Sequence, residues 1–543
     1  MPSLPKFFVV VLTTLYIIPG LIGHDPWKQD ETYVFGIIYS MIKSGDWIVP
    51  MVAGEPFMEK PPLFYWMALL LAKLLSPPLA LHDAARLASG VFTLITVVCI
   101  ERCARLWWGA RVAPLAAIAL MSSAGMLFHS HIMETDIALL AGFAVAVLGL
   151  SGAREGPWKY GLLFGCGVGM GFLSKGVLAP AVMGLTATIL PLAFADWRSR
   201  TYLRNCGIAL LAVLPWLLVW PLVLYLRSPQ LFMDWFWLNN VGRYLGFAVP
   251  ILGAPHTDWF WWRNLPWLTF PVLPLAAYSL YLSHREQGGV LKLPVLQLGV
   301  AMSTVLATIL FSAASARAMY GLPLLLPLAL MAAPAVERLP RAFNRYASWI
   351  VLLLVMLLAA AIWFGWWRMW SSGATPQVSW FQRHLPNHFM LPFSAWQVAL
   401  ALAVSAGGAW LARAALRNGG AVASLAIGFM LLWGLVMSLW VPWIDAGKSY
   451  RTAFHNLPLT ADGAGECVAS VNLGESERAM LHYMNGIITE RHENGEGADC
   501  DWLLVQGFAG QAPEPVRTGI DRLAWEGHRS GDRKIRFWLI RQN

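Results

Sequence analysis

Long apolar runs recur along most of this chain. A helix that crosses the hydrocarbon core of a bilayer needs about 20 apolar residues. Runs of nearly that length lie at 6–23, 61–77, 85–107, 111–128, 136–153, 158–174, 176–195, 205–227, 265–284, 291–313, 318–336, 347–369, 393–413 and 420–442. Only 13% of the residues are charged, against about a quarter in soluble proteins. The sequence therefore predicts an α-helical protein that crosses a membrane many times.

One early run differs from the others. The 61–77 run starts with two prolines, is interrupted by Lys73 and is short, so we expect a helix that lies in the membrane interface. About 13 crossings then remain, with 6–23 as a retained first helix rather than a cleaved signal peptide. With 13 crossings, the basic loops all lie on one side of the membrane, at 102–111, 153–159, 196–204, 283–287, 337–345 and 413–420. The positive-inside rule makes that side the cytoplasm.

The last hundred residues or so change character. Residues 443–543 alternate short strand and helix patterns, which predicts a small α/β domain after a membrane domain at 1–442. By parity this domain and the opening segment 24–84 lie on the outer, periplasmic face of a bacterial inner membrane. Cys467 and Cys500 lie in the tail and could form a disulfide if that face is oxidising.

Acidic residues mark two of the outer loops. Asp30 and Glu31 come directly before a helical pattern, and Asp136 begins a later helix after "HSHIMET". A carboxylate at a helix N-terminus also stabilises the helix dipole without any other role. Because two outer loops each place such a carboxylate at the same membrane face, a functional site of paired acids is a reasonable alternative to helix capping alone.

Cations accompany these acids on the same face. Glu59 and Lys60 precede Pro61 and Pro62, which limit the freedom of the backbone. Lys60 is either an interfacial lysine that reaches towards lipid headgroups or part of a phosphate site. The other cations and the tyrosine considered for that site are Arg243, Arg317, Tyr320 and Lys175.

Metal binding has little support in the sequence. His129, His131 and His256 are possible ligands, but no carboxylate or cysteine spacing accompanies them, and no CxxC or HExxH motif is present. We predict no metal site and no required cofactor; a divalent cation is possible but unsupported.

Several short motifs resemble one family when taken in order. They are "DE" before a short helix, "SGDWIVP", "EKPPLFYW", a "TD" at the start of a later span, "FLSKG", "GRYLG" and "YGLPLLLPLAL". Together they resemble the bacterial aminoarabinose transferases of lipid A and the wider protein mannosyltransferase-like family of polyprenyl-phosphate-sugar glycosyltransferases. The resemblance covers roughly residues 5 to 340. It implies a GT-C fold with 13 membrane helices, interfacial helices in the first periplasmic loop and a periplasmic C-terminal domain.

The resemblance also implies a reaction. A membrane glycosyltransferase of this kind moves a sugar from undecaprenyl phosphate to lipid A or lipopolysaccharide at the periplasmic face. Lys60, Arg243 and Tyr320 would hold the donor phosphate, with Arg317 and Lys175 lining the same site. Asp30, Glu31 and Asp136 would lie at the reacting centre, and Glu59 would hold a neighbouring cation.

Two departures leave the sugar open. The residues that precede "DE" in "HDPWKQDE" differ from those in the family's pattern. The segment Arg317-Ala-Met-Tyr320 matches the corresponding segment of the family only loosely. A hexose, an amino sugar or another pentose would each fit, and the acceptor could be O-antigen, another glycan or a protein. A secondary transporter is the rival class, but it would carry charges near the middle of its spans and a repeat between its halves. An O-antigen ligase would not be expected to carry "DE…EKPP" in its first outer loop.

Overall fold

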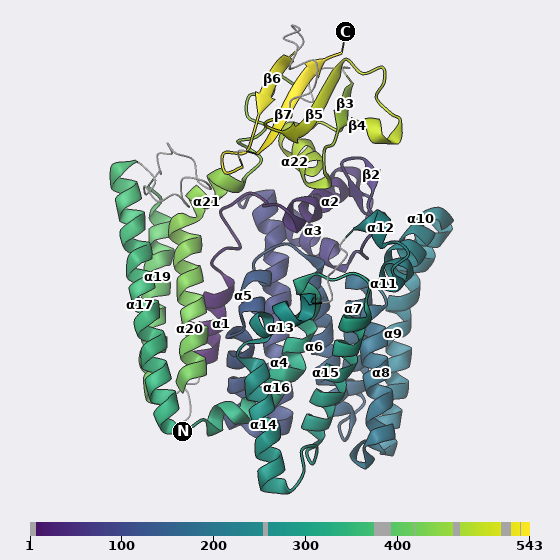
Figure 1. Ribbon diagram of the computed structural model, residues 1–543. Helices are drawn as coiled ribbons and strands as arrows, with labels where there is room; N and C mark the ends of the chain where they lie inside the picture. The colour runs from purple at the N-terminus through teal and green to yellow at the C-terminus, as the bar shows by residue number, and fades with distance from the viewer. Residues whose placement is uncertain are drawn as a thin grey trace.

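Long apolar helices run side by side through most of the molecule (Figure 1). The computed structural model describes residues 7–253, 259–373, 393–418, 420–459, 467–511, 523–532 and 534–542. Within these ranges, 8 helices are long and apolar enough to cross a membrane, or up to 9 if the bent pair α13–α14 is one span. The long spans are α4 (Leu81–Met121), α6 (Thr135–Ala153), α9 (Arg200–Arg227), α15 (Pro294–Ser312), η3 with α16 (Ala318–Arg338), α17 (Arg341–Ser372), α19 (Ala395–Asn418) and α20 with η4 and α21 (Gly420–Lys448).

The predicted polytopic helical fold is confirmed, although the number of crossings depends on shorter helices. Inside α4, Gly109 has φ 78° and ψ 172°, so the 41 residues form two helices joined at a sharp turn. The α13 (Phe260–Thr269) and α14 (Val272–Gln287) helices meet at 80°. Thirteen crossings are reached if α4 counts twice, this bent pair counts once, and α1 (Phe8–Ile17), α7 (Lys159–Lys175) and α8 (Leu178–Ala193) each cross.

The apolar runs differ from the helices in one instructive place. The run at 265–284 was expected to be one span, but the helix breaks at Phe270 and Pro271. Proline has no N–H to continue a helical ladder, so a break at this position follows from its chemistry. The remaining helical segments are short: α5 (Ala124–His129), η1 (Ala195–Trp197), α10 (Pro229–Met233), η2 (Asp234–Gly242), α11 (Arg243–Leu245) and α12 (Val249–Leu252).

A layer of short elements lies between the bundle and the C-terminal sheet (Figure 1). It contains α2 (Asp30–Ser44), the hairpin of β1 (Met51–Val52) and β2 (Glu55–Pro56), and α3 (Leu63–Leu75). The 13 residues of α3 extend about 20 Å, which is short of the roughly 30 Å hydrocarbon core. An interfacial position for α3 stays a prediction, because length alone does not distinguish it from the 10-residue α1.

The tail folds into the expected α/β arrangement. Its five-stranded sheet has the order β4-β3-β5-β7-β6, with β3 parallel to β4 and β5 and the other pairs antiparallel. The elements are β3 (Val468–Val471), α22 (Glu475–Asn485), β4 (Glu490–Arg491), η5 (His492–Asn494), β5 (Trp502–Phe508), β6 (Leu523–Gly527) and β7 (Ile535–Arg541). The last long helix continues without a break to Lys448, and a domain division at residue 442 stays a prediction.

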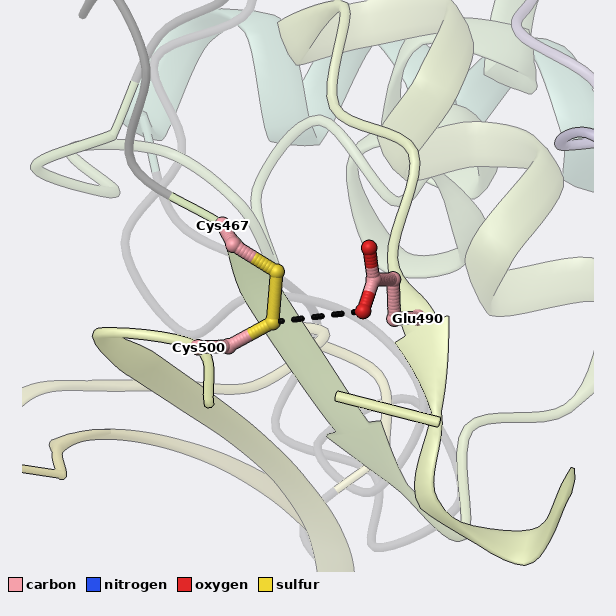
Figure 2. A group of neighbouring side chains, drawn as sticks. All are labelled: Cys467, Glu490 and Cys500. Carbon is pink, nitrogen blue, oxygen red and sulfur yellow. Dashed lines mark hydrogen bonds between the residues drawn. A yellow bond between two sulfur atoms is a disulfide. The ribbon is translucent and has the colours of Figure 1, made fainter. Parts of the chain in front are cut away.

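Two contacts attach and brace this tail. The α22 helix packs on α2 so closely that a Cβ added to Gly36 would lie 2.5 Å from the Cβ of Ala479. Cys467 and Cys500 are joined in a disulfide beside the carboxylate of Glu490 (Figure 2). The pairing that the sequence left open is therefore present.

Candidate active site

A cavity of about 330 Å³ opens beside the layer that contains α2 and α3. Its polar lining residues are Glu59, Lys60, Lys175, Asn239, Asn240, Arg243, Tyr244, Ser315 and Tyr320. Its apolar lining residues come from α8 with the residue before it and from α15 with the residue after it: Val177, Leu178, Ala181, Leu185, Ile309, Leu310 and Ala313. The cavity is therefore lined both by charged and polar groups and by hydrocarbon side chains.

Lys60 is the buried cation of this cavity. Its side chain lies near the phenol of Tyr33, with Nζ 3.4 Å from Oη, and only 7% of the residue is exposed. Burial alone would lower the pKa of Lys60, but the neighbouring Tyr33 and the carboxylate of Asp136 raise it well above its usual value. No carboxylate of a described residue lies within ion-pair distance of Lys60.

Glu59 lies beside Lys60 and holds a second cation. Its Oε1 accepts a hydrogen bond of 2.5 Å from Nη2 of Arg243, at the end of the π-helix η2. Burial opposes ionisation of Glu59, yet the charges of Lys60 and Arg243 outweigh it and hold the pKa of this carboxyl below its usual value. The expectation that Glu59 positions a neighbouring cation agrees with this geometry.

Close packing of α6 on α7 brings Asp136 to Lys175. A Cβ at Gly142 would lie 2.6 Å from the backbone nitrogen of Gly171, so these helices touch backbone to backbone, as small residues allow in membrane proteins. Asp136 begins α6, Lys175 ends α7, and the two side chains form an ion pair. The ammonium of Lys175 also lies 3.8 Å from the ring centre of Tyr320.

Asp30 meets the last of the predicted cations. Its Oδ1 is 3.3 Å from Nη1 of Arg317, which comes directly before the 3₁₀ segment η3 (Ala318–Leu324) that carries Tyr320. Arg243 and Arg317 both interact electrostatically with Tyr320. Eight of the nine residues singled out in the sequence therefore gather around one cavity.

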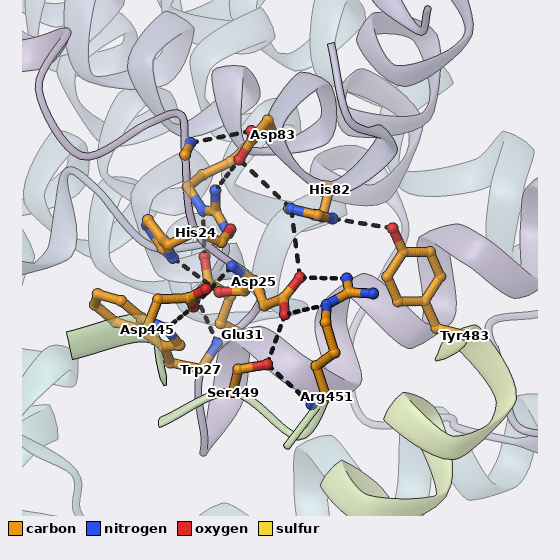
Figure 3. A network of polar contacts seen from close by, with 12 residues as sticks. His24, Asp25, Trp27, Glu31, His82, Asp83, Asp445, Ser449, Arg451 and Tyr483 are labelled. Carbon is orange, nitrogen blue, oxygen red and sulfur yellow. Dashed lines mark hydrogen bonds and ion pairs between the residues drawn. The ribbon is translucent and has the colours of Figure 1, made fainter. Parts of the chain in front are cut away.

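Glu31 is the exception. Its Oε1 accepts a hydrogen bond of 2.7 Å from Nε of Arg86 and one of 3.3 Å from the backbone nitrogen of Met133. Figure 3 shows it in a separate network that joins the first loop and α4 to α21 and the tail. The residues labelled there are His24, Asp25, Trp27, Glu31, His82, Asp83, Asp445, Ser449, Arg451 and Tyr483. Glu31 thus fixes the start of α2 rather than lining the cavity.

Three groups near the cavity were missed by sequence reasoning. Glu134 is fully buried and accepts a hydrogen bond of 2.6 Å from Nδ1 of His129. Asn239 and Asn240 lie in η2 and line the cavity. A π-helix is rare and often marks a functional site, but the segment "DWFWLNNVG" carries no signal for that geometry.

The histidines considered as metal ligands have other partners. Nδ1 of His131 is 2.7 Å from the carbonyl oxygen of Leu127, and its Nε2 is 2.7 Å from that of Tyr16. His256 lies outside the described residues. In the described ranges, one trio, Cys467, Glu490 and Cys500, is close enough together to hold an ion, but its two sulfurs are bonded to each other.

Gly176 provides a test of the cavity wall. It follows α7 with φ 71° and ψ −139°, and an added Cβ would overlap Oδ1 of Asn240. We expect Gly176→Ala to strain the backbone, displace Asn240 and weaken binding of undecaprenyl phosphate, the lipid that the resemblance implies, about tenfold. Binding to the purified protein checks this, with Gly184→Ala on α8 as the matched control, because a Cβ there meets no atom within 4 Å. Equal affinities of the two variants would contradict the expectation.

Comparison with known proteins supports the resemblance seen in the motifs. The family of dolichyl-phosphate-mannose-protein mannosyltransferases matches residues 59–225. Undecaprenyl phosphate-alpha-4-amino-4-deoxy-L-arabinose arabinosyl transferase from Aeromonas hydrophila is 29% identical over 381 residues, 67% of this chain and 66% of that protein. The protein of the same name from Pseudomonas aeruginosa is 29% identical over 354 residues, 63% of this chain and 61% of that protein. The chain thus spans less than two thirds of the length of these relatives.

Solved structures extend the likeness to the whole fold. The crystal structure of ArnT from Cupriavidus metallidurans bound to undecaprenyl phosphate has a TM-score of 0.66 at 16% identity, covering 98% of this chain and 97% of that one. Its apo state has a TM-score of 0.67 at 17% identity with the same coverage. The chain is therefore a relative of the undecaprenyl phosphate-aminoarabinose arabinosyl transferases, as its motifs predict, and it has the GT-C membrane fold of the ArnT structures.

Proposed function

We propose that this protein is a glycosyltransferase that moves a sugar from undecaprenyl phosphate to lipid A or another lipid-linked glycan. The relatives are named as transferases that use an undecaprenyl phosphate-linked sugar, and a structure of the same fold holds undecaprenyl phosphate. These likenesses support the donor class. The acceptor is inferred from the resemblance of this chain's motifs to the aminoarabinose transferases of lipid A.

The position of Lys60 carries the proposal. Lys60 is buried and has no carboxylate of a described residue in ion-pair distance, so its ammonium can bind an anionic group of a ligand. Lys60 shares its cavity with the apolar side chains of Leu178, Leu185 and Leu310. A ligand with an anionic phosphate and a long hydrocarbon tail matches both features, and an undecaprenyl phosphate-linked sugar is such a ligand.

The residues around the cavity suit displacement at the sugar. An acceptor oxygen would attack the anomeric carbon, and the bond from that carbon to the donor phosphate would break with its electron pair on the phosphate. Lys60 and Arg243 would stabilise the leaving phosphate, which is commonly worth about 3 kcal/mol of barrier per well-placed donor. Tyr320 would hold Arg243 in place through their interaction.

The fate of the proton depends on the acceptor. A hydroxyl acceptor must lose a proton, and a positioned carboxylate would accept it. Oδ2 of Asp136 is buried and has no hydrogen-bond partner among the described residues, and Asp30 lies beside Arg317. A phosphate acceptor is already anionic and needs no base, so in that case both carboxylates would orient the reactants.

The proposed location is the periplasmic face of the inner membrane. Cavity-lining residues 59–60 follow β2 and residues 243–244 lie in α11, and both elements lie on the side of the bundle that faces the C-terminal sheet (Figure 1). The turn between α14 and α15, which follows the basic segment 283–287, lies at the opposite end. The positive-inside rule supports a cytoplasmic location for that opposite end. A disulfide in the tail agrees with an oxidising compartment.

Mass spectrometry of lipid A and core oligosaccharide tests the proposal. Cells with the protein are expected to carry a sugar-sized mass addition that is absent from cells without it and lost in Asp30→Ala cells with equal protein in the membrane. An addition on O-antigen or a protein instead would change the acceptor but keep the reaction. Unaltered glycans, together with no binding of undecaprenyl phosphate to the purified protein, would overturn the proposal.

A further inference from the structure

We infer that Glu477, in the C-terminal α/β unit, positions Asp30 for sugar transfer; this inference rests on the function proposed above. Glu477 lies in the first turn of α22 and is only 2% exposed. It does not line the cavity described above. Its contacts are instead with the short segment of the first outer loop that leads into Asp30, so we assign it a positioning role and no direct contact with the substrates.

The carboxylate of Glu477 holds a lysine two residues before Asp30. Its Oε1 accepts hydrogen bonds of 2.8 Å from Nζ of Lys28 and 2.6 Å from the phenol of Tyr450. In the part of the chain that the structure describes, Lys28 is the one cation within ion-pair distance of this carboxylate. Tyr450 is fully buried. The phenol therefore fixes the carboxylate, and the carboxylate fixes Lys28.

A second contact holds the residue directly before Asp30. Oγ of Ser476 donates a hydrogen bond of 3.2 Å to the carbonyl oxygen of Gln29. Oγ1 of Thr32 donates one of 2.8 Å to the same oxygen. Together with the ion pair of Glu477, this contact attaches two successive residues of the first loop to two successive residues of α22.

The backbone around Asp30 is thus held on both sides. The tail holds the residues before it, and Glu31 after it pairs with Arg86 in the bundle at 2.7 Å. The ion pair of Asp30 itself is longer, with Oδ1 3.3 Å from Nη1 of Arg317, against about 2.7–2.9 Å for a strong charge-assisted hydrogen bond. The place of this carboxylate therefore depends on how its neighbours in the chain are held.

The α22 helix is itself fixed on the first loop and α4. A Cβ added to Gly36 of α2 would lie 2.5 Å from the Cβ of Ala479. The ring centres of Phe35 and Tyr483 are 4.7 Å apart, and Oη of Tyr483 is 3.0 Å from Nδ1 of His82. These contacts do not involve Glu477. A change of Glu477 should therefore move the segment before Asp30 and leave α22 in place.

Glu477→Gln tests the inference. Glutamine keeps the size of the side chain and an acceptor for the phenol of Tyr450, but it removes the charge that holds Lys28. We expect the initial rate of sugar addition in cells to fall about tenfold or more at equal protein in the membrane, because small displacements of a catalytic group are costly. Mass spectrometry of the modified glycan over time measures this rate.

Binding of the donor lipid should not follow that loss. Lys60 and Arg243, which would hold the donor phosphate, keep their contacts in Glu477→Gln. We therefore expect the purified full-length variant in lipid nanodiscs to bind labelled undecaprenyl phosphate as tightly as the unaltered protein does. A loss of rate without a loss of affinity distinguishes positioning of Asp30 from a general disturbance of the cavity.

Two further variants define the cause. Lys28→Met removes the same ion pair from its other end, so the double variant with Glu477→Gln should be no slower than the slower single variant. Arg451→Gln is the matched control, because it removes another ion pair between the tail and the first loop, that of Arg451 with Asp25 at 2.8 Å. It leaves the contacts of residues 28–30 in place and should change the rate little.

The outcomes separate this inference from the proposed function. An unaltered rate in Glu477→Gln, an equal loss of rate in Arg451→Gln, or a matching loss of affinity for undecaprenyl phosphate would each overturn the positioning role and keep the proposed function. If the unaltered protein added no sugar to any glycan and bound no undecaprenyl phosphate, both would be overturned.

Discussion

Lys60→Met is expected to reduce sugar transfer by a factor of about a hundred or more. Lys60 is the cation of the cavity that lacks a carboxylate in ion-pair distance among the described residues, so the donor phosphate would lose its main counter-charge. The rate of transfer and the affinity for undecaprenyl phosphate should both fall. Both can be measured with purified protein in nanodiscs.

The stability of this variant separates a binding role from a structural one. Methionine has a similar length and no charge, so replacing a buried lysine that has no ion-pair partner among the described residues should leave the thermal unfolding temperature equal or higher. Lys73→Met on α3 is the matched control, because Lys73 is exposed and lies over the ring of Trp47. Normal transfer by Lys60→Met would remove Lys60 from the site.

Arg86→Met is expected to destabilise the protein by about 3–5 kcal/mol, the usual effect of removing one partner from a buried ion pair. Arg86 is fully buried in α4 and pairs with Glu31 at 2.7 Å and Asp83 at 2.8 Å. It also donates a hydrogen bond of 3.0 Å to the carbonyl oxygen of His24. Its loss would leave two carboxylates without their cation. Thermal unfolding in detergent, followed by tryptophan fluorescence, measures the change.

Two further variants test whether the loss of stability comes from the buried ion pairs of Arg86. Arg102→Met changes an exposed arginine of the same helix and should alter stability little. A triple variant that adds Glu31→Gln and Asp83→Asn to Arg86→Met should regain part of the lost stability, because the unpaired charges are then gone. If Arg86→Met were as stable as Arg102→Met, the network in Figure 3 would not hold the first loop in place.

The sequence predicted most members of the cavity and misassigned one neighbour. Asp30 and Glu31 are adjacent in the chain and both near a helix start, so a linear motif treats them as one acidic pair. Successive residues on a helix point in directions about 100° apart. Asp30 therefore reaches Arg317 while Glu31 reaches Arg86.

Other features had a weak signal in the sequence or none. The pair of Glu134 with His129 and the π-helical turn with Asn239 and Asn240 depend on backbone geometry that no residue spacing encodes. The break at Pro271 had a signal in the proline, but an apolar run on each side concealed it. The disulfide of Cys467 with Cys500 needed the sheet to bring the two residues together.

The sequence by itself determined that this chain lies in a membrane, where its helices fall and that its tail is an α/β unit. These properties are local, because each stretch of about 20 apolar residues satisfies its own backbone hydrogen bonds in lipid whatever its neighbours do. The tertiary structure decided which charges meet. Glu59 pairs with Arg243 across 184 positions and Asp30 with Arg317 across 287, and such pairs arise only after helices with small residues at their contacts have packed closely enough to bring distant loops to one cavity.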